Sequence, residues 1–173
     1  MGADMTRAAA FAWVLGISLS MALPMAAQTA KVRKTIAKDE AKYEREKKPV
    51  GHAKEAVKLG RVEYKAARQC VDAGNVSGAL QFLKDYNQQA IAAHDALEKT
   101  GVDAEKHSNG FRQLQISTRE SLRQLRDIAG RVPFEQSQPF RALEKNLDAL
   151  NQKLILELFP RQPGHKISEE KKH

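Results

Sequence analysis

Residues 76–99 read VSGALQFLKDYNQQAIAAHDALEK, and this stretch decides the fold. Apolar residues recur in it at alternating intervals of three and four without a break: Val76, Ala79, Leu83, Tyr86, Ala90, Ala93 and Leu97. Such a heptad seam is typical of helices that pack nearly parallel or antiparallel to one another. We therefore expect one long helix here, with Asn75 as its N-cap, Gly101 as its stop, and neighbours along its length.

Helices of similar length are predicted on both sides of this seam. Residues 53–73 have two apolar faces, which indicates more than one neighbour, and Gly74 ends the segment. The seam pattern returns in residues 103–129, with Asp103 as the expected cap, and again in residues 139–159. No stretch has the alternation of a β-strand. The sequence predicts an all-α protein: an elongated antiparallel helical bundle of four main helices over residues 51–160, with a charged N-terminal arm.

The turn before the seam has a recognisable local pattern. Residues 74–80, GNVSGAL, resemble the turn and second-helix start of a tetratricopeptide unit. The resemblance covers this one turn, no second copy follows at the expected spacing, and the helices are longer than in that repeat. We interpret it as a shared way of packing a helical hairpin.

The segments outside the bundle are dominated by charge. Residues 28–50 hold eight Lys and Arg against four acids, and we interpret them as a charged arm or marginal helix. Residues 161–173 follow Pro160 and are predicted to be a disordered charged tail.

The first 27 residues have the layout of a secretory signal peptide. Arg7 precedes twenty residues without a charge, residues 8–27, and small residues end the run at Ala26 and Ala27. The prediction is cleavage after Ala27 and an exported protein, periplasmic or secreted. The alternative is an uncleaved membrane anchor over residues 8–27, favoured by the positive charges at residues 31–34. Contact with a membrane through this segment is expected only in that case.

Motifs for catalysis, metals or cofactors do not appear in the sequence. Every Met and the Trp lie within residues 1–27, and Cys70 is the one cysteine. His94 and His107 have no Cys or carboxylate at ligand spacing, and we interpret the histidines as surface residues. We therefore predict a non-enzymatic protein without a cofactor.

A row of arginines is the candidate binding feature. Arg112, Arg119 and Arg126 are spaced by seven and Arg123 falls between them, so all four lie within an arc of about 60° opposite the apolar seam. Forked hydrogen bonds from such a row can hold phosphates, sulfates or carboxylates. The other interpretation is a solvated face that pairs with acids of a neighbouring helix.

Two functions are compatible with these features. The first is an exported helical interaction protein of the cell envelope, an adaptor, scaffold or chaperone-like protein, whose partner is another envelope protein or a second copy. Its candidate partner surfaces are Leu59, Val62, Ala66 and Cys70 on one helix, and Leu156 with Phe159 at the end of another. The second is a binder of anionic lipid surfaces or polysaccharides through the arginine row. Nucleic acid is disfavoured because the basic arm lacks interleaved aromatic residues.

Overall fold

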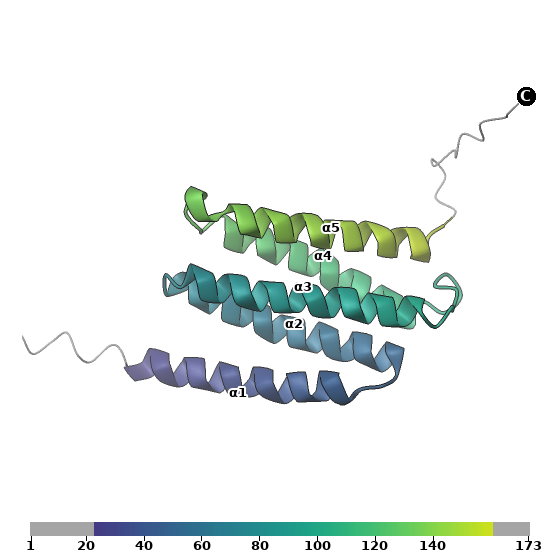
Figure 1. The fold of residues 1–173 in the computed structure, drawn as a ribbon, viewed down its shortest axis with the longest axis horizontal. Coiled ribbons are helices and arrows are strands. Elements are labelled where there is room, and N and C mark those ends of the chain that lie inside the picture. Colours follow the sequence, from purple (N-terminus) through teal and green to yellow (C-terminus); the bar gives the residue numbers. More distant parts are fainter. Residues whose placement is uncertain (1–22, 161–173) are drawn as a thin grey trace, which may run out of the picture.

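The computed structural model describes residues 23–160, and this part of the chain is helical and without strands (Figure 1). The all-α prediction is therefore confirmed. The elements are α1 (Leu23–Arg45), α2 (Pro49–Asp72), α3 (Val76–Glu98), α4 (Asn109–Ala129), the short 3₁₀ helix η1 (Phe134–Gln136) and α5 (Gln138–Leu158).

The predicted tail and most of the predicted signal peptide lie outside the described residues. The proposed cleavage bond after Ala27 falls inside α1, which begins at Leu23. Within residues 23–160, no helix has the length and apolarity needed to cross a membrane.

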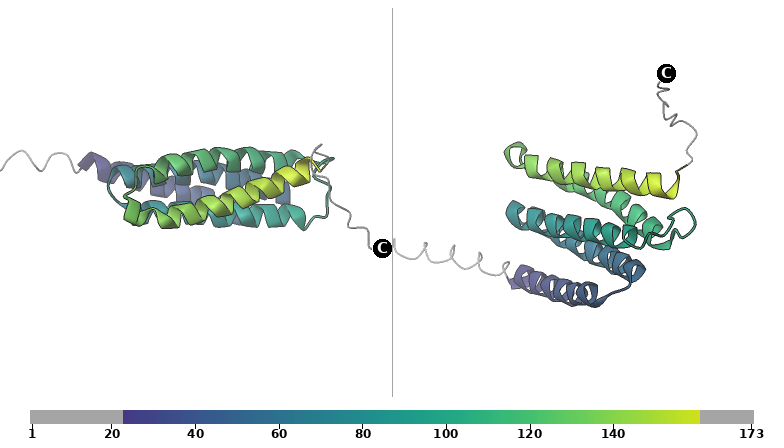
Figure 2. Two further views of the ribbon diagram at one scale, coloured as in Figure 1. Left: turned by 90° about the horizontal axis from the view of Figure 1, so that it is seen from above. Right: turned by 45° about the vertical axis from the view of Figure 1, so that its right-hand side comes forward.

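The long helices form two layers and alternate in direction along the chain. In the view of Figure 1, α3 and α5 lie in front and α2 and α4 lie behind them. Within this arrangement α2 packs against both α3 and α4, while α5 packs against both α4 and α3. The first helix, α1, packs on the side of α2 (Figure 2). Each of the helices α2 to α5 therefore packs against at least two other long helices.

The seam of α3 forms the centre of the core. From Ala79 to Leu97 every seam residue is buried, as predicted. The ring of Tyr86 lies directly against Gly60 of α2, where a Cβ atom would come within 2.2 Å of it, and edge-on to Tyr64 at 5.2 Å between centroids. Gly60 therefore provides the space for the largest side chain of the seam.

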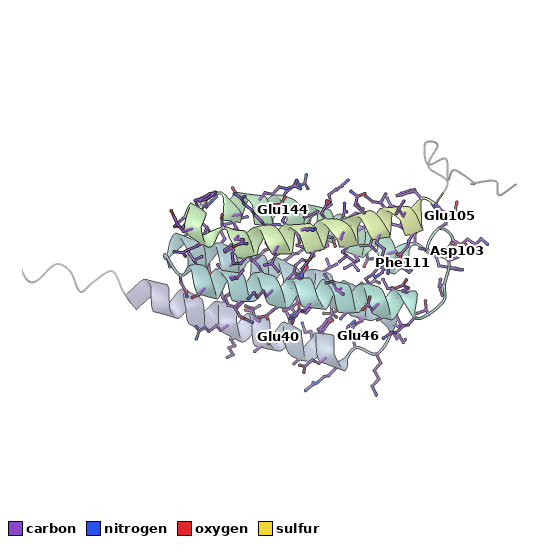
Figure 3. The ribbon with its side chains drawn as sticks, turned by 45° about the horizontal axis from the view of Figure 1, so that its top comes forward. Glu40, Glu46, Asp103, Glu105, Phe111 and Glu144 are labelled. Atoms are coloured by element: carbon purple, nitrogen blue, oxygen red, sulfur yellow. The ribbon has the colours of Figure 1, made fainter. Side chains whose placement is uncertain are left out.

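One predicted helix boundary, at Gly74 and Asn75, is confirmed, and another, at Asp103, is not. Gly74 adopts a φ of 74° after α2, and Asn75 Oδ1 accepts a hydrogen bond from the Gly78 amide at 2.9 Å, as a cap should. The predicted start of the next helix at Asp103 is wrong, because α4 begins at Asn109. Asp103 Oδ1 accepts from the amide of Glu105 and closes a separate turn at the end of the molecule (Figure 3).

The charged segment over residues 28–50, predicted as an arm or a marginal helix, is helical as far as Arg45 in α1, and its last two residues, Pro49 and Val50, begin α2. Val32, Ile36 and Tyr43 share one face of α1 among the charges, and they pack with Leu59 and Ala66 of α2. A small apolar cluster, separate from the main core, therefore holds α1 against α2.

Polar contacts join α1 to the second and third helices at the same place. Tyr43 Oη donates to the backbone oxygen of Gln89 at 3.3 Å, and Gln89 Nε2 donates to Glu63 Oε1 at 3.0 Å. Glu63 is buried, and its second oxygen, Oε2, has no hydrogen-bond partner among the described residues. The pKa of Glu63 is raised to about 8: burial raises it most, the hydrogen bond from Gln89 lowers it, and the nearby carboxylates of Asp85 and Glu40 raise it.

Replacing Ile36 by serine is expected to release α1 while α2 to α5 stay folded. The substitution removes most of an apolar side chain that is 6% exposed, at a cost of about 2–4 kcal/mol to the docking of α1. Hydrogen exchange followed by mass spectrometry should show faster exchange in residues 32–45 alone. Lys34→Ser, at an exposed position of the same helix, is the control; loss of protection in every helix would contradict this prediction.

Candidate functional site

The four predicted arginines are all exposed on the outer surface of α4. We call these four residues, Arg112, Arg119, Arg123 and Arg126, the α4 row. Arg126 Nε donates to Glu144 Oε1 of α5 at 2.6 Å, and this hydrogen bond raises the pKa of Arg126. The side chains of Arg112, Arg119 and Arg123 make no ion pair or hydrogen bond within residues 23–160. Pairing with a neighbour's acid thus applies to Arg126 alone, and three guanidinium groups stay available to an external anion.

A second row of cations, which is not among the predicted site residues, lies on α2. Its members, which we call the α2 row, are exposed and recur at intervals of four, three, four and three: Lys54, Lys58, Arg61, Lys65 and Arg68. At ~100° per residue they fall within an arc of about 80°. Intervals of three and four residues, which identify the apolar seams, also identify this row when they are looked for among Lys and Arg. Lys58 pairs with Glu55, while the other four have no ion pair within the described part of the chain.

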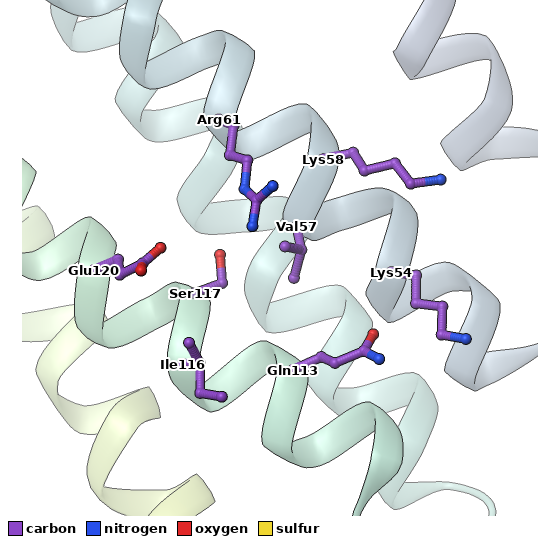
Figure 4. Close-up of a pocket in the computed structure, with 8 residues that line it drawn as sticks. All are labelled: Lys54, Val57, Lys58, Arg61, Gln113, Ile116, Ser117 and Glu120. Carbon is purple, nitrogen blue, oxygen red and sulfur yellow. The ribbon is translucent and has the colours of Figure 1, made fainter.

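The packing of α2 against α4 brings the two rows onto one face. A groove runs between the helices, and its lining includes Lys54, Lys58 and Arg61 from one side and Ile116 from the other (Figure 4). Arg112, Arg119 and Arg123 are four before, three after and seven after Ile116, so they follow the same exposed stripe of α4. The structure therefore assembles an α2–α4 face with a cation row along each side of a groove.

The groove itself has a mixed lining and a volume of about 370 Å³. Arg61 and Glu120 extend toward each other from opposite helices, with Ser117 between them (Figure 4). The Ser117 side chain is 8% exposed, and its hydroxyl lies 3.4 Å from the hydroxyl of Tyr86. Burial raises the pKa of Tyr86 well above its usual range, so this phenol remains a neutral hydrogen-bonding group.

The acids of α2 and α4 are nearly all neutralised or buried. Asp72 and Asp127 both pair with Arg131, at 3.4 and 3.2 Å, at one end of the face. Glu55 pairs with Lys58, and Glu63 is buried at the junction with α1. Glu120 is the one remaining carboxylate of these two helices, and it has no ion pair or hydrogen bond within residues 23–160.

The predicted partner surface on residues 59–70 is not free. Leu59 is fully buried and Ala66 is 4% exposed, because α1 covers them, while Val62 and Cys70 are partly buried in the same region. The expectation of an exposed patch is therefore wrong, although the inference of a second neighbour is right. Burial also raises the pKa of the Cys70 thiol, against the lowering effect of Arg33.

The second predicted patch is exposed. Leu156 and Phe159 are each 58% exposed at the C-terminal end of α5. They are among the most exposed large apolar side chains in the described structure, exceeded only by Phe134.

One histidine departs from the predicted surface position. His94 is buried, and its Nε2 lies 3.0 Å from both carboxylate oxygens of Glu157, which is 63 residues away in the chain. Its ligand atoms come within 4.8 Å of those of Asp95 and Glu98, a set that could surround a metal ion. Lys153 Nζ forms an ion pair with Glu98 Oε2 at 2.9 Å. We therefore interpret the group as an ion-pair network that joins α3 to α5.

Comparison with protein-family models, with characterised proteins and with solved structures finds no match to this chain. We therefore infer the function from the geometry and the charges of the α2–α4 face.

Proposed function

We propose that this protein is a non-enzymatic binder of an extended polyanion, and that the α2–α4 face is its binding surface. One observation carries the proposal: apart from Lys58 and Arg126, the cations of the two rows have no ion pair within residues 23–160. A cation that already pairs with an acid of the protein adds little binding energy for an external anion. An unpaired Arg or Lys can offer that anion several hydrogen-bond donors. The proposal therefore favours the second of the two functions compatible with the sequence.

The dimensions of the rows favour a polymer over a single small anion. Each row spans fourteen residue steps, from 54 to 68 and from 112 to 126, which corresponds to about 21 Å of helix. Successive cations are about 4.5–6 Å apart along the axis in the α2 row and about 4.5–10.5 Å apart in the α4 row, so several anionic groups can be held at once. A ligand with repeating charges would gain from every contact along this length.

We propose that the support for this face is an antiparallel four-helix bundle of α2 to α5, with α1 as an added fifth helix. The alternating directions of the helices and their pairwise packing support this description. Export remains part of the proposal, because the uncharged N-terminal run has the layout of a signal peptide. Outside the cytoplasm, a basic face would meet the anionic polymers and lipids of the cell envelope.

Neutralising three unpaired arginines of this face is expected to weaken binding to heparin at least tenfold. The variant is Arg61→Gln with Arg119→Gln and Arg123→Gln, and the loss follows because each cation releases counterions from the polyanion. The slope of log affinity against log salt concentration should become shallower by about two to three. Isothermal titration calorimetry at several salt concentrations measures both quantities.

A charge-matched control distinguishes this face from simple net charge. Lys84, Lys99 and Lys145 are exposed cations of α3, its C-terminal end and α5, and their triple replacement by Gln also removes three charges. We expect the control to bind within about threefold of the wild type at moderate salt. Equal losses of heparin affinity in both variants, or wild-type affinity that does not depend on salt concentration, would contradict the proposal.

A second candidate function is docking of another envelope protein or a second copy of this chain. It is favoured by the exposed apolar end of α5, where Leu156 and Phe159 flank the partly exposed Glu157. Apolar side chains at such exposure are common singly, and this pair is more informative because it lies at one helix end.

A further inference from the structure

We propose that the polyanion is an acidic polysaccharide, and that the groove between α2 and α4 receives the hydroxyl groups of its sugar rings. This inference rests on the proposed function and narrows it to one class of ligand. Its basis is the polar groove of the α2–α4 face, whose carboxylate, Glu120, would not favour binding of a ligand that carries negative charges alone.

Glu120 is the first reason for this choice. An unpaired carboxylate beside the cation rows repels any ligand that presents only phosphate or sulfate oxygens. The same carboxylate is a strong acceptor for a ligand that carries hydrogen-bond donors between its charges. Sugar hydroxyls are such donors, and an acidic polysaccharide places them beside its anionic groups.

The other groups in the groove match the same ligand. Gln113 uses Nε2 to donate to Asn109 at 2.9 Å, which leaves its Oε1 available as an acceptor. Ser117 adds a hydroxyl at the floor, and Arg61 faces Glu120 with donors for a carboxylate or sulfate (Figure 4). The groove thus offers cations along its α2 side and acceptors along its α4 side, which suits a ligand that carries both anionic groups and hydroxyls (Figure 4).

The shape of the groove favours a chain of rings over a flat surface. Its volume of about 370 Å³ is at the lower end of the range of roughly 300–1,000 Å³ for small-molecule sites. Val57 and Ile116 supply apolar surface against which the C–H groups of a ring can pack. A planar lipid headgroup layer would touch the helix ridges, whereas Ser117, with 8% exposure, lies below them.

The test compares three probes with the full chain and its Glu120→Ala variant. The probes are polygalacturonate, inorganic polyphosphate and phosphatidylglycerol vesicles, at one ionic strength and at equal concentrations of charge. We expect the wild type to prefer polygalacturonate. Glu120→Ala should lower its affinity for polygalacturonate about tenfold, because a hydrogen bond to a charged acceptor is lost. The same variant should bind polyphosphate at least as tightly as the wild type, because a repulsive charge is gone.

A control and two contrary outcomes make this result decisive. Glu135→Ala removes an exposed carboxylate of η1, outside the groove, and should leave the order of the three probes unchanged. If Glu120→Ala tightens binding to all probes, or if the wild type prefers polyphosphate or vesicles, the polysaccharide inference is overturned while polyanion binding stands. If the wild type binds none of them in a salt-dependent way, both proposals fail. Circular dichroism of each variant verifies that the helices are intact.

Discussion

Gly60→Ala is expected to lower the free energy of unfolding by about 3 kcal/mol, although alanine is intrinsically the better helix former. An added Cβ atom would lie 2.2 and 2.4 Å from two ring carbons of Tyr86. That ring is fully buried and is held on another side by Tyr64, so it has no low-energy position to move into. Urea unfolding followed by circular dichroism measures the change.

Gly130→Ala is the matched control for this substitution. Gly130 follows α4 with an ordinary helical φ of −67°, and an added Cβ atom would approach nothing closer than 3.4 Å. Its stability should be unchanged or slightly higher. In a Tyr86→Leu background the cost of Gly60→Ala should shrink by half or more, since the clashing ring is absent. Equal effects at the two glycines would contradict the close packing of α2 against α3.

The buried carboxyl group of Glu63 predicts a second large effect, on the pH dependence of stability. Its pKa is about 8 in the folded protein and near 4.5 when exposed to solvent. Between these pH values the folded protein keeps a proton that the unfolded chain has released. Stability therefore falls as the pH rises from about 4.5 to about 8, by up to about 4–5 kcal/mol, and this term stays constant above that range.

Glu63→Gln should remove this pH dependence. The amide stays neutral, keeps an acceptor for Gln89 and has nearly the same shape, so its stability should exceed that of the wild type most strongly near pH 8.5 and least near pH 5. Urea unfolding at pH 5, 7 and 8.5 measures the difference. Glu44→Gln, at an exposed position of α1, removes the same charge as a control. Parallel curves for wild type and Glu63→Gln would refute this assignment.

Detachment of α1 limits the size of this effect. Glu63 lies where α1 meets α2 and α3, and Glu40 of α1 is one of the carboxylates that face it. If α1 separates at high pH, water reaches the carboxylate and the loss cannot exceed the free energy of docking α1. Hydrogen exchange in residues 32–45 should then rise with pH before exchange in α3 does.

Local patterns predict the helices and their buried faces well. The seam of α3 is buried as its spacing requires, and Thr118 and Ser121, polar residues at seam positions of α4, are also buried. The start of α4 could not be predicted in this way. Asp103 has the chemistry of a helix cap, and whether it caps a long helix or a single turn depends on where the chain must reverse direction.

The spacing of residues in the sequence does not predict which helices pack against each other. The second apolar face of α2 is visible in the sequence, but its cover is α1, whose described side chains over residues 32–45 supply only Val32, Ile36 and Tyr43 as apolar contacts among many charges. The spacing of arginines predicts the α4 row, whereas its alignment with the α2 row depends on the packing of two helices that begin sixty residues apart, at residues 49 and 109. The groove residues Arg61 and Glu120 meet for the same reason.

The odd number of alternating helices gives the molecule two unlike ends. The start of α1 and the end of α5 lie at opposite ends of the helices (Figure 1). A helix of 21 residues is about 31 Å long, so the exposed side chains of Leu156 and Phe159 at the end of α5 lie about one helix length away from the start of α1.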